Sequence, residues 1–236
     1  KGIPTIVCNT KHMPNGLLLP LAAHSRYSLI IQDQLAMSKP LKKRLWQKII
    51  IQKIQNQAIA LDLLHKNSSD IRQLIKKVIS GDSTNRESVA ANKYFKTLIP
   101  EGTRRASDYT APLDYGYAIL RAGIARTLVS GGWLVSIGIK HSNTFNELNL
   151  VDDFIEPFRP CVDYLVFKND IKELNTHNKH ILTSIFEQSV QCGNEHMAIQ
   201  QAIEKMTYSF KQAVTENDPQ KLLLPILENF SLESIE

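Results

Sequence analysis

The spacing of hydrophobic side chains changes once along the chain, from strand-like to helical. Residues 5–8 predict a short buried strand, residues 14–16 a turn, and residues 17–21 a second apolar run. Because nothing precedes this strand with which it could pair, we expect the chain to begin inside a domain. From about residue 30 the apolar positions recur three and four residues apart, which is typical of amphipathic helices. The sequence therefore predicts a mainly α fold.

Capping residues and helix breakers bound the predicted helices. Ser38, with Pro40 in the first turn, begins a long helix. Ser68 or Ser69 caps the next one, whose apolar stripe extends to Gly81. The helices are expected at residues 38–64, 68–81, 84–99, 113–128, 146–158 and 199–210.

Glycines and prolines interrupt this pattern at defined places. Gly116 and Gly123 lower the helix propensity of the fourth helix, so we expect another helix to approach it closely there. Residues 133–139 are short and β-prone, which predicts a strand or an extended link. Pro157 and Pro160 are expected to break the fifth helix.

Positive charge is concentrated at the start of the chain. Residues 1–60 carry nine Lys and Arg against one acid, Asp33, and the whole chain has a formal net charge of +5. This asymmetry favours a phosphate-bearing partner, but a solvated basic helix face explains it equally well. The basic face expected on the first long helix consists of Lys42, Lys43, Arg44, Lys48 and Lys53.

Composition excludes several classes of protein. Hydrophobic residues make up 43% of the chain and charged residues 22%, which is typical of a globular fold. Because no run of about 18 apolar residues occurs, we expect neither a transmembrane helix nor a membrane partner. Three scattered cysteines without a CxxC pair argue against a structural zinc site or a disulfide framework. A reducing, cytoplasmic location is therefore expected.

Glu87 is the first candidate for chemistry. It lies in the first turn of the helix that Thr84 or Asn85 is expected to cap, where an acid stabilises the helix dipole. However, Glu87 precedes Ala91 by four residues, and Ala91 belongs to the inward stripe of this helix. An inward carboxylate needs a cation, a metal ion or hydrogen-bond donors as a partner.

A second candidate cluster follows the extended segment. Asp152 and Asp153 lie four and three residues before Glu156, so either pair shares a helix face. Together with His141, these oxygen ligands suit Mg²⁺ or Mn²⁺. The alternative is that both aspartates face solvent and that His141 is a satisfied core histidine.

Taken together, these two stretches resemble a known family, the CRISPR-associated adaptation integrase, and most closely its short type II forms. The resemblance extends from about residue 8 to residue 165, and the tail after it carries no recognisable motif. The segments that carry it are Lys11-His12 before Asn15-Gly16, Ser38-Lys39-Pro40, Leu45-Trp46-Gln47, Gly81-Asp82 through Phe95, Leu113 through Ala122, Gly138-Ile139 before His141, and Asp152-Asp153 through Pro160.

The resemblance implies a domain division and a metal site. Residues 1–22 would be the end of a small N-terminal β-rich domain, and residues 23–236 a helical catalytic domain. The family's metal ligands correspond to Glu87, His141 and Glu156, with Asp153 as a supporting catalytic residue and Mg²⁺ or Mn²⁺ as the metal ion. The three ligands are expected to converge at one polar cleft.

The resemblance also implies a reaction and its partners. A DNA 3′-hydroxyl attacks a phosphodiester, so that short DNA fragments enter a repeat array as new spacers, and water in its place gives endonuclease activity. The implied partners are double-stranded and branched DNA, a second copy of the chain in a homodimer, and the small second Cas adaptation protein. By adjacency, the residues expected to bind DNA phosphates are Arg86, Arg104, Arg105, Lys140, Lys39, Lys42 and Lys43.

Two other functions fit the same residues. A transposon-borne integrase would use this site on different DNA ends, but the tail after residue 210, with five acids and two lysines, does not resemble an added DNA-binding module. A helical DNA-binding scaffold without chemistry would not need Glu87, His141 and Glu156 together. A metal-dependence assay on branched DNA separates the scaffold from both integrases.

Overall fold

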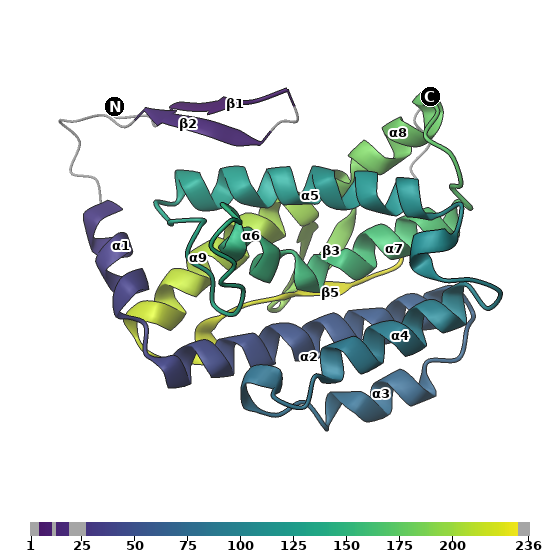
Figure 1. Ribbon diagram of the computed structural model, residues 1–236, viewed down its shortest axis with the longest axis horizontal. Helices are drawn as coiled ribbons and strands as arrows, with labels where there is room; N and C mark the ends of the chain where they lie inside the picture. The colour runs from purple at the N-terminus through teal and green to yellow at the C-terminus, as the bar shows by residue number, and fades with distance from the viewer. Residues whose placement is uncertain (1–4, 11–12, 19–26, 231–236) are drawn as a thin grey trace.

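Helical periodicity is realised along most of the chain (Figure 1). The computed structural model describes residues 5–10, 13–18 and 27–230. The predicted mainly α fold is confirmed. The helices are α1 (Tyr27–Ala36), α2 (Lys39–Leu63), α3 (Ser69–Ile75), α4 (Arg86–Leu98), α5 (Thr110–Ser130), α6 (Asn149–Phe154), α7 (Arg159–Lys168), α8 (Thr176–Thr183) and α9 (Ile199–Thr215).

Short 3-10 turns connect several of these helices. They are η1 (Ser80–Asp82), η2 (Arg104–Ala106), η3 (Glu156–Phe158), η4 (Ser184–Glu187) and η5 (Pro219–Lys221). Within the described part of the chain, no helix is long and apolar enough to cross a membrane.

The first described residues form a two-stranded antiparallel ribbon rather than a strand and a turn. β1 (Thr5–Cys8) is the predicted strand, and it pairs with β2 (Pro14–Leu18). The predicted turn at residues 14–16 is therefore wrong, because these residues belong to the ladder. Residues 11–12 and 19–21, the rest of the predicted motif and apolar run, lie outside the described residues. The ribbon contacts α5, and its assignment to a separate domain stays a prediction.

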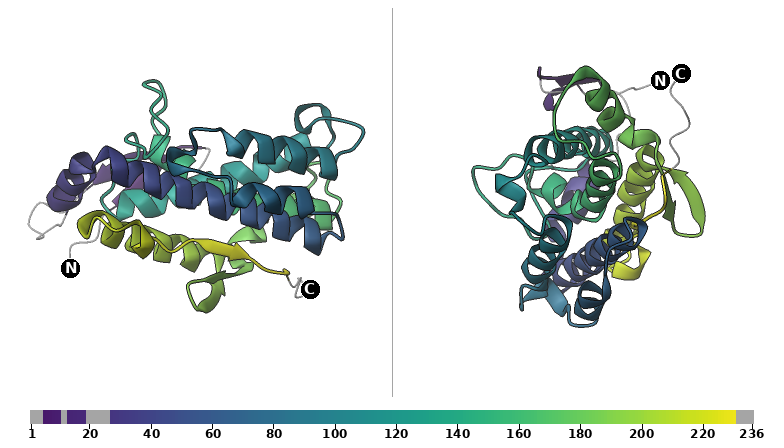
Figure 2. Two further views of the ribbon diagram at one scale, coloured as in Figure 1. Left: turned by 90° about the horizontal axis from the view of Figure 1, so that it is seen from below. Right: turned by 90° about the vertical axis from the view of Figure 1, so that its right-hand side faces the viewer.

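Helix α2 is the central element of the fold. Its predicted start is confirmed, because the Ser38 hydroxyl accepts a hydrogen bond from the N–H of Leu41 at 3.3 Å. The helix contacts α3, α4 and α7, and β5 (Pro225–Leu227) runs along it (Figure 2). One residue departs from the predicted basic face: Lys53 is buried among neighbouring elements instead of solvated.

The turn between α3 and α4 differs from the prediction. The helix expected to end at Gly81 ends at Ile75, and the apolar stripe continues into an irregular turn in which Val78 is buried. Asn85 adopts a left-handed conformation and its side chain does not cap α4. Instead, the Asp82 carboxylate accepts from the N–H groups of Arg86 and Glu87 at 2.8 and 3.0 Å. Asp82 therefore fixes the first turn of α4.

Helix α5 confirms the interpretation of its glycines. A Cβ atom added at Gly116 would lie 2.5 Å from a methyl carbon of Val162 in α7, and one at Gly123 would lie 2.5 Å from the Phe186 ring. Both neighbours therefore approach the α5 backbone more closely than any side chain there would allow. Pro160 does not end helical structure as expected but occupies the first turn of α7, where proline is well tolerated.

The C-terminal part contains a small sheet that the sequence did not predict. Strands β3 (Ser189–Cys192) and β4 (Glu195–Ala198) form a hairpin, and β5 pairs with the other edge of β3, giving the antiparallel order β4-β3-β5. The predicted apolar stripe of α9 is confirmed, because Ile199, Ile203, Met206 and Phe210 are all buried.

Candidate functional site

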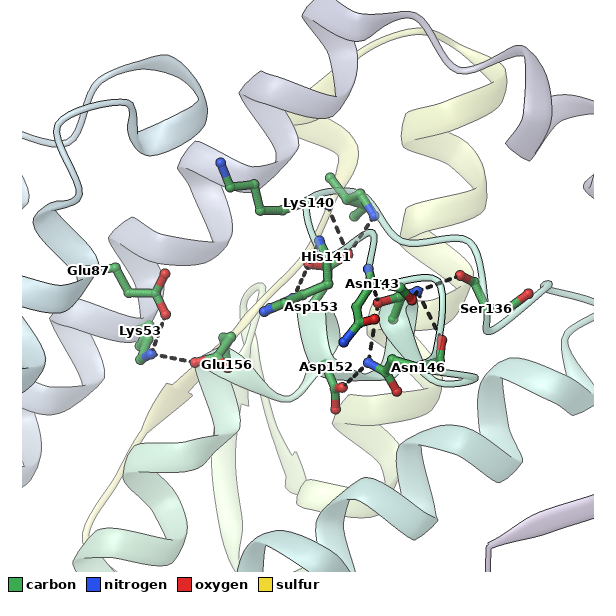
Figure 3. A network of polar contacts seen from close by, with 12 residues as sticks. Lys53, Glu87, Ser136, Lys140, His141, Asn143, Asn146, Asp152, Asp153 and Glu156 are labelled. Carbon is green, nitrogen blue, oxygen red and sulfur yellow. Dashed lines mark hydrogen bonds and ion pairs between the residues drawn. The ribbon is translucent and has the colours of Figure 1, made fainter. Parts of the chain in front are cut away.

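Two candidate carboxylates meet at one ammonium group. Lys53 in α2 lies 2.7 Å from Oε1 of Glu87 in α4 and forms a second ion pair with Oε2 of Glu156 in η3 (Figure 3). The lysine side chain is only 10% exposed. Glu87 therefore faces inward as the sequence predicted, and the cation it requires is supplied by Lys53.

Glu156 is buried and remains ionised. Burial alone would raise its pKa, but Lys53 and Arg159 outweigh this effect and hold the pKa of Glu156 below its ordinary value. Arg159 donates from Nε to Oε1 at 2.9 Å. Within the described residues, Oε2 is buried and has no hydrogen-bond partner of good geometry, only the ion pair. This oxygen can therefore coordinate a cation.

Lys53 remains charged in this position. Burial alone would lower its pKa, but the charges of Glu156 and Glu87 more than compensate, so that the pKa of Lys53 is raised. Two carboxylates and two cations thus form a charge-balanced group. The sequence carried a signal for Lys53, because it follows Ile49 and Ile50 by four and three residues and hence lies on the apolar stripe of α2.

His141 is oriented by Asp153. Its Nδ1 lies 2.8 Å from Oδ1 of Asp153, and since a carboxylate only accepts, Nδ1 carries the proton and Nε2 is left for another partner. The side chain of His141 is 43% exposed, so it is not a core histidine. The hydrogen bond to Asp153 outweighs partial burial and raises the pKa of His141, and the Glu156 carboxylate adds to this effect.

Asp153 and Asp152 have different partners, which separates their roles. Asp153 is fully buried and accepts from the backbone N–H groups of Ile139, Lys140 and His141 at 2.5, 3.1 and 3.1 Å. Asp152 pairs instead with Arg121 of α5, at 2.7 and 3.0 Å. Neither aspartate faces solvent freely, and it is Asp153 that contacts His141, while its catalytic role stays a prediction.

The loop carrying His141 is held from two sides. Gln34 of α1 donates to the carbonyls of Leu134 and Ile137, both at 2.9 Å, and accepts from the N–H of Leu134. Residues 133–139 are neither the predicted strand nor an extended link but a series of turns and bends, in which the N–H of Ile137 donates to the carbonyl of Leu134 at 3.1 Å. Gly138 has no room for a side chain, because a Cβ atom would lie 2.4 Å from the carbonyl oxygen of His141. No pattern in the sequence pointed to Gln34.

The site fits a cation that prefers oxygen ligands. Two carboxylates already share one cation, one of their oxygens lacks a hydrogen bond, and a histidine with its Nδ1 fixed by an acid lies in the same region (Figure 3). Within the described residues, no three His, Cys, Asp or Glu side chains are close enough together to form a complete metal site. The convergence of all three ligands therefore stays a prediction.

The predicted phosphate-binding residues have varied environments. Lys42 lines a pocket of about 300 Å³ with His141. Arg104 lines another of about 270 Å³ with Lys53 and Glu156, and it stacks over the Tyr117 ring at 5.2 Å. The Nε atom of Arg86 is buried without a hydrogen bond among the described residues. The remaining candidates are exposed at the surface: Arg105, Lys140, Lys39 and Lys43.

The fold and the site together define a helical protein with a buried, carboxylate-lined cation site. The family model described as "CRISPR associated protein Cas1" matches residues 1–191. Over 233 residues the chain is 39% identical to the CRISPR-associated endonuclease Cas1 of Neisseria meningitidis serogroup C (strain 8013), covering 95% of this chain and 77% of that protein. The chain belongs to the Cas1 family.

Solved structures show the same fold. A chain of a partial Cas6-RT-Cas1–Cas2 complex superposes with a TM-score of 0.76 at 16% identity, covering 97% of this chain and 82% of that chain. A casposase bound to its integration product gives a TM-score of 0.74 at 18% identity, covering 91% and 76%. At such low identity these similarities establish the fold and nothing about the chemistry.

Proposed function

We propose that this protein is a metal-dependent DNA integrase and endonuclease that inserts short foreign DNA fragments into a CRISPR array as new spacers. The observation that carries this proposal is the meeting of Glu87 and Glu156 at one cation position. The relative from Neisseria meningitidis is called an endonuclease, and the casposase structure holds an integration product. Both names agree with a reaction on DNA phosphodiesters.

In the proposed reaction a DNA 3′-hydroxyl attacks a phosphodiester, and the bond to the leaving 3′-oxygen breaks without a covalent enzyme intermediate. Mg²⁺ or Mn²⁺, when bound, supplies activation of the hydroxyl and neutralisation of the charge that builds on the phosphate oxygens. Glu87 and Glu156 would hold the ion through oxygen and His141 through Nε2. Asp153 keeps the imidazole oriented by accepting from Nδ1.

The surrounding cations bind the DNA backbone in this proposal. Lys42 and Arg104 line pockets that also contain His141 and Glu156, respectively. Phosphate contacts of this kind position DNA with little sequence readout. Because one structural neighbour is part of a Cas1–Cas2 assembly, we propose the small second Cas protein as a partner, and a homodimer of this chain stays part of the same proposal.

The test measures three properties on the same variants. Glu87→Ala, His141→Ala and Glu156→Ala should each abolish strand transfer on branched DNA with Mg²⁺ or Mn²⁺ supplied, because ligands of one metal ion act as a unit. Affinity for DNA should stay within a few-fold of the parent. A folded His141→Ala variant that joins DNA at the parent rate would remove His141 from the site.

A further inference from the structure

The ammonium group of Lys53 occupies the position that a shared metal ion would need. It lies 2.7 Å from Glu87 and contacts Glu156 as well. A hard divalent ion bound by the same oxygens would lie about 2.0–2.6 Å from them. Two cations cannot occupy this space together, since they would overlap and repel each other. Lys53 and a divalent ion are therefore alternative occupants of one position.

The ammonium group of Lys53 also has an alternative position next to Gln57. Gln57 follows it by four residues on the same face of α2, and its side-chain carbonyl Oε1 is buried without a hydrogen-bond partner among the described residues. Gln57 itself is only 2% exposed. Lys53, Gln57 and Glu156 line the same pocket of about 270 Å³, together with the carboxylate of Asp163. An ammonium group turned into this pocket thus meets an acceptor that is otherwise unsatisfied.

We propose that Lys53 is a resident cation that holds Glu87 and Glu156 together until a divalent ion takes its place, whereupon the ammonium group moves towards Gln57. This inference rests on the proposed function, since it concerns the same metal position. Lys53 is then a positioning residue that sets the affinity for metal, not a ligand.

The exchange has two consequences. Without metal, Lys53 keeps two like charges from repelling each other and holds both carboxylates near their working positions. When the metal ion binds, part of its binding free energy is used to displace the lysine. The measured affinity for metal is therefore weaker than it would be for the same two carboxylates without Lys53 between them. A monovalent ion, with its smaller charge, gains too little from the same oxygens to displace Lys53.

The main experiment titrates the full chain with Mn²⁺ and follows free Mn²⁺ by electron paramagnetic resonance. Lys53→Met should bind Mn²⁺ at least tenfold more tightly than the parent, and without metal it should melt at a lower temperature that Mn²⁺ largely restores. The matched control is Lys48→Met, which removes a lysine of the same helix that donates to the Pro219 and Gln220 carbonyls. Its Mn²⁺ affinity should equal that of the parent.

A second measurement needs no loss of the lysine. The ¹⁵Nζ NMR signal of Lys53 is assigned as the one that is missing from the spectrum of Lys53→Arg. In the parent protein this signal should shift as Mg²⁺ saturates the site. Gln57→Leu, which removes the acceptor, should weaken Mn²⁺ binding several-fold. A Lys53 signal that stays fixed at saturating Mg²⁺, or unchanged or weaker Mn²⁺ binding by folded Lys53→Met, overturns the exchange.

The outcomes also separate this inference from the proposed function. Suppose that the parent binds Mn²⁺, that Glu87→Gln abolishes this binding and that Lys53→Met leaves it unchanged. This result overturns the exchange but keeps the metal site. No Mn²⁺ binding by the parent or by Lys53→Met overturns both.

Discussion

The side-chain amide of Asn56 donates a hydrogen bond to the backbone carbonyl of Pro157 at 2.7 Å, and so ties α2 to the residue that follows Glu156. The same amide donates to the carbonyl of Pro225 at 2.9 Å, and its oxygen accepts from the N–H of Leu227 at 3.1 Å. Asn56 is fully buried. One side chain therefore fixes the position of η3, and hence of Glu156, against both α2 and β5.

Asn56→Leu should destabilise the protein by about 3 kcal/mol, because it leaves two carbonyls and one N–H buried without partners. For a chain of this size the melting temperature should fall by roughly 10 °C. Thermal unfolding followed by circular dichroism measures the change. Asn92→Leu, at an exposed position of α4, is the control and should change the melting temperature by less than about 2 °C.

Asp153→Asn and Asp152→Asn form a matched pair. At position 153 an amide would turn an NH₂ group towards N–H donors or lose the contact to His141, so we expect a loss of about 2–4 kcal/mol in the free energy of unfolding and strongly reduced strand transfer. At position 152 the pairing with Arg121 and the hydrogen bond from the Asn146 amide at 2.7 Å weaken, while the contact of Asp153 with His141 is kept. Strand transfer by Asp152→Asn should stay within a few-fold of the parent. Equal losses in both variants would contradict the assignment of Asp153 to His141.

Binding of duplex DNA should fall steeply with salt. Each phosphate contact contributes a slope of roughly −0.9 in log affinity against log salt concentration. Lys140→Ala and Arg105→Ala should each reduce the magnitude of the slope by about this amount, whatever the DNA sequence. Lys179→Ala, on exposed α8 away from the site, is the control and should leave the slope unchanged. Affinity measured by fluorescence anisotropy between 50 and 200 mM salt, roughly the range over which such contacts respond strongly, provides the slope.

Asp163 predicts an unusual dependence of stability on pH. Burial raises its pKa to about 6, against the opposing effects of the hydrogen bond from Tyr117 and of two nearby arginines, Arg104 and Arg159. Between the unfolded value near 3.8 and about 6 the folded state binds more protons than the unfolded state, so this group lowers stability as pH rises through that window. Above pH 6 its cost is constant.

The free energy of unfolding of Asp163→Asn, minus that of the parent, should therefore rise between about pH 4 and pH 6 and then level off, by up to about 3 kcal/mol. Urea unfolding at several pH values measures this difference. Because both proteins share every other titrating group, the remaining pH effects largely cancel. A flat difference would contradict the raised pKa of Asp163.

Local signals in the sequence predicted most helices well. The Ser38 cap, the stripe of α9 and the glycines of α5 act through neighbours three or four residues away or through a missing side chain, and each was found. The end of α3 and the cap of α4 were missed. There the apolar spacing continues beyond the helix, and Asp82 reaches its N–H partners from outside the expected capping position.

Such local signals do not predict features that depend on residues far apart in the chain. The sheet β4-β3-β5 pairs Val190 with Leu227, and strands of three or four residues have too little periodicity to be recognised. The candidate site shows the same division. The sequence predicts Glu87, Asp153 and Glu156 as site residues but places Lys53 on a basic face. The position of Lys53 on the apolar stripe of α2 indicates its burial, but its two partners lie on elements whose position only the fold reveals.

Lys53 and Asn56 together determine how α2 is positioned in the protein. Apolar side chains tolerate a small shift of their helix along its axis, because one apolar neighbour can replace another. Asn56 allows no such freedom, since a shift of one residue would turn it about 100° away from the carbonyls of Pro157 and Pro225. The same rotation would carry Lys53 away from both glutamates. Helix α2 therefore has a single register. It is set by Lys53, which belongs to the site, and by Asn56, which positions Glu156.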